Sequence, residues 1–135
     1  MIQNINHIGI AVKDLDASIE LFSKIFNTDK FHRETVEEQM VAIASFKVGN
    51  VILELTAPTS EESTIHKFIE KRGEGIHHIA FASDSIEEDL ARLKIDNVNL
   101  INDTPINGAH DMLIAFLHPK STNGVLMELC QPKID

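Results

Sequence analysis

Two residue types that bind metals and move protons, histidine and glutamate, recur at matched positions in the two halves of this chain. His7 and His78 lie 71 residues apart, and Glu54 and Glu128 lie 74 residues apart. Imidazole nitrogens and carboxylate oxygens are ligands of borderline divalent ions such as Co²⁺, Mn²⁺, Ni²⁺ and Zn²⁺. A carboxylate near such an ion can also serve as a general acid or base. These four residues are therefore the candidates for chemistry.

The matched residues lie in stretches that align over more than single positions. Residues 7–22 (HIGIAVKDLDASIELF) align with residues 78–93 (HIAFASDSIEEDLARL). Residues 51–58 (VILELTAP) align with residues 125–132 (VLMELCQP). The two offsets differ by three residues, which a short loop insertion accounts for. Similarity at two places with nearly constant spacing indicates a duplicated unit.

The elements that must position the four residues follow the same order in each half. A β-branched run opens the half, an amphipathic helix follows, and short strands end it. The expected elements cover residues 5–12, 15–26, 41–48 and 51–56, and then 76–82, 86–93, 113–117 and 125–130. A further helix over 63–72 is expected to stop at Gly73 and Gly75. The sequence thus predicts one α+β domain over 1–135, with pseudo-repeats 1–58 and 74–135 joined by a helical linker, 59–73.

Each glutamate falls inside an apolar strand, which is an unusual place for a charge. Because side chains alternate along a strand, Glu54 shares a face with Thr56, and Glu128 shares a face with Cys130. A carboxylate there is costly to bury unless it is paired or bound to a cation. Taken singly, a glutamate of this kind is more typical of an exposed strand edge, and each histidine of a structural hydrogen bond. Their recurrence at matched positions favours a joint metal site instead.

The remaining histidines and the single cysteine have no counterpart at a matched position of the other repeat, so nothing comparable favours them as metal ligands. His77 should point away from the site and be structural, because it precedes His78 on the same strand. Cys130 has the right parity to approach the site but is more typical of a small buried hydrophobe than of a ligand. The histidines without a repeat partner are expected at loops or on the surface: His32, His66, His110 and His118.

Composition excludes several classes of function. Twelve Lys and Arg against 21 Asp and Glu give a net charge of -9, which argues against general nucleic-acid binding. One cysteine permits no internal disulfide and no thiolate-rich metal site. No apolar run reaches the roughly 18–20 residues of a membrane span, and the first residues lack the pattern of a signal peptide. We therefore expect a cytoplasmic protein that binds neither nucleic acid nor membrane.

Three stretches resemble a known family. They are residues 6–12 (NHIGIAV), 63–81 (the inter-repeat helix through KRGEGIHHIAF) and 116–129 (FLHPKSTNGVLMEL). With the paired His and Glu residues, they resemble the vicinal oxygen chelate superfamily, which includes glyoxalase I, extradiol dioxygenases and antibiotic resistance proteins. Within it, they are most similar to the methylmalonyl-CoA epimerases. The resemblance covers essentially the whole chain.

The resemblance implies a fold and a ligand set. The fold is two tandem β-α-β-β-β modules that form one curved mixed sheet around a metal site, and the assembly is a homodimer. The implied ligands are His7, His78 and Glu128, with Glu54 in the fourth place. Some epimerases instead have Gln at the position of Glu54 and a separate catalytic Glu where this chain has Ile43. The loop at 105–110 also replaces a more glycine-rich loop of the family.

The implied reaction interconverts (2R)- and (2S)-methylmalonyl-CoA by removing and returning the proton alpha to the thioester. A divalent metal would stabilise the enolate, while Glu128 and Glu54 would alternate as base and acid. Lys67, Lys71, Arg72 and Lys120 would offer positive charge to the phosphates of the acyl-CoA thioester, or are simply solvated. The alternative is glyoxalase I acting on the methylglyoxal–glutathione hemithioacetal. A metal-free binding protein and an extradiol dioxygenase fit the four ligands less well.

Overall fold

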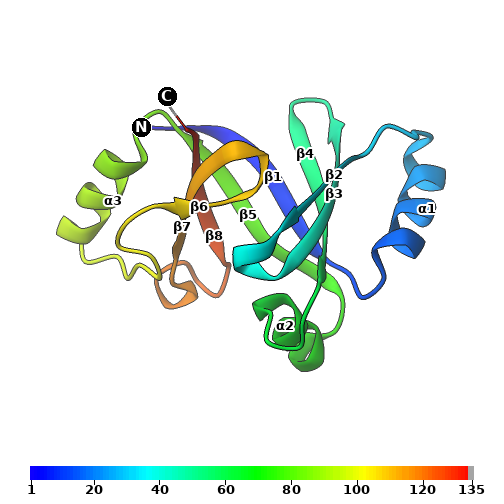
Figure 1. Cartoon of the computed structure of the whole chain (residues 1–135). Helices are drawn as coiled ribbons and strands as arrows, with labels where there is room; N and C mark the ends of the chain where they lie inside the picture. The colour runs from blue at the N-terminus through cyan, green and yellow to red at the C-terminus, as the bar shows by residue number, and fades with distance from the viewer. Residues whose placement is uncertain (134–135) are drawn as a thin grey trace. The chain divides into compact units, whose positions relative to one another are not determined.

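The computed structural model describes residues 1–133, which form an α+β structure with eight strands and three α-helices (Figure 1). The strands are β1 (Ile2–Ala11), β2 (His32–Val36), β3 (Val41–Val48), β4 (Val51–Pro58), β5 (Gly75–Ser83), β6 (Ile106–Asn107), β7 (Met112–Leu117) and β8 (Met127–Pro132). The helices are α1 (Leu15–Phe26), α2 (Thr64–Arg72) and α3 (Ile86–Ile95). The predicted α+β class and the repeated β-α-β-β-β order are confirmed.

Two strands were not predicted, and several strand boundaries differ from the prediction by one to three residues. The sequence did not indicate β2 or β6, because both are short, largely exposed edge strands without a clear apolar alternation. β8 begins at Met127 rather than at Val125. The N–H of Val125 donates to the carbonyl of Thr122 (3.2 Å) and so closes the preceding turn.

The helices begin and end at residues whose chemistry suits those places. The side chains of Asp14, Ser63 and Ser85 each accept a hydrogen bond from a backbone N–H in the first turn of α1, α2 and α3. α2 ends at Gly73, which has a φ of 79° and relieves the strain that a side chain would meet there. None of the helices in residues 1–133 combines the length and the apolar character that crossing a membrane requires.

The chain divides into two compact units that do not coincide with the predicted repeats. One, the continuous unit, is Ile8–His77. The other, the composite unit, joins Met1–His7 to the chain from His78 onward. The divisions fall inside β1 and β5, so each unit contains part of both strands. As a result His7 and His78 both belong to the composite unit.

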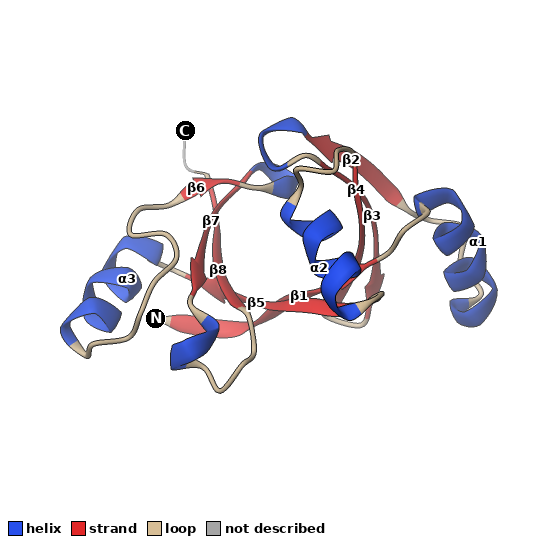
Figure 2. Ribbon diagram, turned by 90° about the horizontal axis from the view of Figure 1, so that it is seen from below, coloured by secondary structure: helices blue, strands red, loops and turns tan. Residues whose placement is uncertain are grey.

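The continuous unit contains the strand order β2-β3-β4-β1, and its β2–β3 and β3–β4 ladders are antiparallel. One face carries the buried residues Ala44, Leu55 and Ala57, which pack against α1. From α1, the expected apolar residues Leu15, Ile19 and Phe22 reach this cluster. Figure 2 shows α1 beside the β2, β3 and β4 strands of this unit. The side chains on the opposite face of the β3–β4 ladder are therefore turned away from α1.

The composite unit contains the strand order β1-β5-β8-β7-β6. β5 and β8 are parallel, whereas β8–β7 and β7–β6 are antiparallel, so the sheet is mixed as predicted. Ile86 and Leu90 of α3 pack on Leu129 of β8 and its neighbours. Leu93 joins this cluster, which confirms the predicted apolar face of the helix. Since Leu129 faces α3, Glu128 lies on the other face of the sheet.

Candidate metal centre

Three of the four predicted residues meet in the composite unit. His7 lies on β1, His78 on β5 and Glu128 on β8, and they are only 5%, 7% and 3% exposed. The Nε2 atoms of His7 and His78 are 3.2 Å apart. The Glu128 carboxylate oxygens lie 3.3 Å from His7 Nε2 and 3.5 Å from His78 Nε2. The parallel pairing of β5 with β8, in which Ala80 is opposite Glu128, brings His78 to the face that carries the carboxylate.

These separations fit three ligands of one ion. Metal–ligand bonds of about 2.0–2.2 Å place neighbouring ligand atoms about 3.0–3.5 Å apart in octahedral or tetrahedral geometry. The three observed donor separations fall between 3.2 and 3.5 Å. Two imidazoles and a carboxylate are also the donor types that Co²⁺, Mn²⁺, Ni²⁺ and Zn²⁺ accept. The residues present therefore suit a divalent transition metal.

Asn6 lies beside this centre, although no sequence pattern singled it out. Its Oδ1 lies 2.7 Å from Nδ1 of His7. An amide oxygen can only accept, so this contact is a hydrogen bond when Nδ1 of His7 carries the proton, which leaves the lone pair of Nε2 available to a metal ion. The one available signal was its position immediately before His7 in the NHIGIAV stretch.

Cys130 lies close to the three donors. A ligand atom of His7, one of Glu128 and the thiol of Cys130 all lie within 4.8 Å of one another. The cysteine is completely buried in an apolar cluster with Ala80 and Ile114. Its thiol is 3.6 Å from the carbonyl oxygen of Phe81. The sequence predicted both properties of Cys130: its place on the same strand face as Glu128 and its burial as a small residue.

Glu54, the fourth predicted residue, belongs to the continuous unit. It is 3% exposed on β4 and lies opposite Ser45 of β3 in the ladder. Thr56, two residues further on the same face, lies opposite Ile43. All four are buried on the face turned away from α1. Ile43 places an apolar side chain there, where some epimerases have a glutamate.

The other histidines have structural or surface positions. Burial lowers the pKa of His77 to about 4, so its ring is neutral, and it packs edge-on against Phe68 with centroids 4.9 Å apart. His66 pairs with Glu70 on α2 at 3.4 Å. Nδ1 of His118 accepts a hydrogen bond from the N–H of Lys120 (3.1 Å). His32 is exposed on strand β2, and its Nε2 lies 3.4 Å from Glu34.

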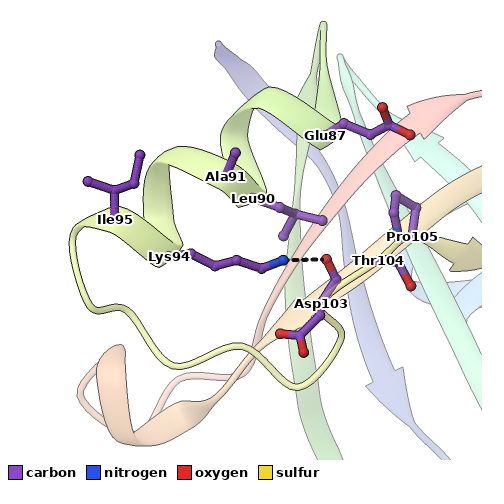
Figure 3. Close-up of a pocket in the computed structure, with 8 residues that line it drawn as sticks. All are labelled: Glu87, Leu90, Ala91, Lys94, Ile95, Asp103, Thr104 and Pro105. Atoms are coloured by element: carbon purple, nitrogen blue, oxygen red, sulfur yellow. Dashed lines mark hydrogen bonds between the residues drawn. The ribbon is translucent and has the colours of Figure 1, made fainter.

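A separate cavity of about 430 Å³ lies beside α3. Figure 3 shows Leu90, Ala91 and Lys94 along one wall and the segment 103–105 along the other. Nζ of Lys94 donates to the carbonyl of Asp103 (3.1 Å) across this cavity. α3 covers the face of β8 opposite Glu128, so this cavity is remote from the metal centre.

Comparisons with known proteins agree with this geometry. A family model for the Glyoxalase/Bleomycin resistance protein/Dioxygenase superfamily matches residues 6–116. The uncharacterized protein YqjC of Bacillus subtilis is 44% identical over 97% of this chain and 94% of the relative. The mitochondrial methylmalonyl-CoA epimerase of Dictyostelium discoideum is 37% identical over 95% of this chain and 78% of the relative. A Streptomyces coelicolor methylmalonyl-CoA epimerase variant, solved with 2-nitronate-propionyl-CoA, has a TM-score of 0.93 at 39% identity, covering 98% of this chain and 96% of its own.

Proposed function

Because the chain belongs to the glyoxalase/bleomycin resistance protein/dioxygenase superfamily, we propose that it is a metal-dependent epimerase that interconverts (2R)- and (2S)-methylmalonyl-CoA. The observation that carries this proposal is the convergence of His7, His78 and Glu128 within 3.5 Å. Relatives that carry the name methylmalonyl-CoA epimerase align over most of their length. Their names support the choice of this reaction over the other activities of the superfamily.

In this proposal His7, His78 and Glu128 hold a divalent ion, with Glu54 as fourth ligand. The ion is Co²⁺, Mn²⁺, Ni²⁺ or Zn²⁺. When bound, it supplies Lewis-acid stabilisation to the negative charge that develops on the thioester oxygen. The buried position of Glu54 supports its assignment, since an enclosed carboxylate needs compensating positive charge.

The chemistry assigned to the protein's own residues is proton transfer. One carboxylate removes the proton alpha to the thioester, and the electron pair of the broken C–H bond passes to the thioester oxygen as the enolate forms. The other glutamate, which starts as the protonated acid, gives its proton to the opposite face of the alpha carbon, so the two residues exchange protonation states. We assign these roles to Glu128 and Glu54, whose burial keeps bulk water from the enolate. No tyrosine is present in the chain to compete for the role.

The proposal also covers binding of the CoA part of the substrate, the oligomeric state of the protein and its cellular location. Lys67, Lys71 and Arg72 project from α2 as exposed cations, and Lys120 is exposed in the other unit. We assign them to attraction of the CoA phosphates. We also propose a single functional domain, a homodimer and a cytoplasmic location. The superfamily assignment and the absence of a membrane-spanning helix in residues 1–133 are compatible with these assignments.

Proton exchange in heavy water tests the proposed reaction directly. Protein loaded separately with each of the four metals is incubated with methylmalonyl-CoA in D₂O, and loss of the alpha-proton signal is followed by NMR. Exchange that depends on added metal and disappears with a chelator is expected. Failure of all four metals to support exchange would contradict the epimerase proposal. Turnover of the methylglyoxal–glutathione hemithioacetal without exchange of methylmalonyl-CoA would establish glyoxalase I instead.

A further inference from the structure

The two histidines of the metal centre have different surroundings. Nδ1 of His7 faces the amide oxygen of Asn6 at 2.7 Å. The ring of His78 meets Phe116 edge-on, with centroids 5.7 Å apart. The repeat places His77 at the position that matches Asn6, and His77 turns to Phe68 instead. The residue that precedes the metal-site histidine is therefore an amide in the first copy of the repeat and an imidazole in the second.

The chemical effect of this contact follows from the tautomers of imidazole. A neutral histidine has one N–H and one lone pair, and an acceptor at Nδ1 fixes the proton on that nitrogen. The lone pair then lies on Nε2, the atom 3.2 Å from His78 Nε2 and 3.3 Å from Glu128. A hydrogen bond at the second nitrogen also fixes the plane of the ring and raises the basicity of the donor nitrogen.

We propose that Asn6 is a positioning residue that locks His7 in the metal-binding tautomer and makes it the anchoring imidazole of the centre. Asn6 does not touch the metal or the substrate and acts through His7. The inference rests on the proposed metal centre, but not on the identity of the substrate. Loss of the contact should weaken metal binding about tenfold to 100-fold, the range usual for partners of metal-bound histidines.

Two substitutions at Asn6 separate the hydrogen bond from packing. Asn6→Leu keeps the side-chain size but removes the acceptor, whereas Asn6→Asp keeps an oxygen at the same place. Asn4→Leu is the matched control, because Asn4 is exposed two residues earlier on β1 and its amide reaches only a backbone carbonyl. Zn²⁺ and Co²⁺ affinities of these variants are measured by calorimetry. Nitrogen NMR of metal-free protein reports which nitrogen of His7 carries the proton.

The expected results are specific to the acceptor. Wild-type His7 shows a protonated Nδ1 and an unprotonated Nε2, and Asn6→Leu loses this preference together with at least tenfold in metal affinity. Asn6→Asp restores both, and Asn4→Leu leaves both unchanged. Equal metal affinity of Asn6→Leu and wild type, or an Nε2-protonated His7 in wild type, would overturn the proposal. If metal binds as expected but methylmalonyl-CoA undergoes no exchange, the epimerase proposal fails while the role of Asn6 stands.

Discussion

The continuous and composite units share one plan but carry different chemistry on matching faces. In each, a helix packs on one face of the sheet, and a buried glutamate lies on the other: Glu54 away from α1 and Glu128 away from α3. Glu128 has two imidazoles within 3.5 Å. In the ladders, Glu54 lies opposite the hydroxyl-bearing Ser45, whereas Glu128 lies opposite the aromatic Phe116. Duplication has thus produced equivalent positions with different cross-strand neighbours.

Because Met1–His7 belongs with the chain from His78 onward, both histidines fall in the unit of Glu128. Under the proposed function, Glu128 is both a metal ligand beside two imidazoles and an acid or base. Glu54 is the second acid or base, and its loss leaves His7, His78 and Glu128 as metal donors. The comparison therefore predicts that the two glutamates fail differently when they are neutralised.

The largest effects are expected from Glu128→Gln, with Glu54→Gln as its matched variant. Loss of the Glu128 charge should lower metal affinity by about 100-fold or more and reduce alpha-proton exchange by at least about 1,000-fold, since ligand and base are both lost. Glu54→Gln should reduce exchange by about 100-fold but change metal affinity by less than about tenfold, because three donors remain. Calorimetry with Zn²⁺ and NMR exchange measure the two quantities. Equal loss of metal affinity in both variants would contradict the unequal division of roles.

The core offers a matched pair that should behave alike. Leu55 and Leu129 occupy equivalent repeat positions, are at most 1% exposed, and pack against α1 and α3 in their respective units. Leu55→Ala and Leu129→Ala should each destabilise the protein by about 2–5 kcal/mol through lost burial and the cavity left behind. Urea unfolding monitored by circular dichroism gives the free energies. A cost below about 1 kcal/mol for one variant alone would show that its unit is packed more loosely.

The matched residues of the two units also show which structural features the sequence could predict. Alternation along the strands placed Glu54 on one face with Thr56 and Glu128 on one face with Cys130, because alternation is a local property. Repeat alignment also brought His7, His78 and Glu128 forward as a set. Local patterns did not reveal β2 and β6, whose short edge strands depend on pairing with a neighbour rather than on apolar alternation.

Two other features, the unit boundary inside β1 and the contact of Asn6 with His7, could not be predicted from the sequence for a different reason. The division of the chain between His7 and Ile8 depends on which strands pair over long sequence distances, and no local pattern reports that. Asn6 matters through a side-chain distance to Nδ1 of His7, and asparagine beside a strand histidine is too common to signal it. The sequence therefore indicated the candidate metal ligands, whereas the structure was needed to show which side chains surround each of them.

The smallest expected effect concerns an ion pair that only the composite unit has. Asp89 of α3 is buried, whereas the hydroxyl of Ser18, the matching residue of α1, donates to the carbonyl of Asp14 within its own helix (2.7 Å). Burial alone would raise the pKa of Asp89. Hydrogen bonds from Ser83 (2.5 Å) and Arg92 (3.3 Å), with the Met1 ammonium at 3.4 Å, more than offset this and hold the pKa below its usual value.

A carboxylate whose pKa is lower in the folded state stabilises the fold above its unfolded pKa, near 3.9. The contribution is lost as the pH falls through the folded pKa. Asp89→Asn should therefore cost about 1–2 kcal/mol at pH 7 and progressively less in acid. Urea unfolding at pH 7, 4 and 3 tests this, with Ser18→Ala as the matched control that shows no such pH dependence. A deficit of Asp89→Asn that stays constant across this range would mean that packing, and not the charge of Asp89, distinguishes the composite unit.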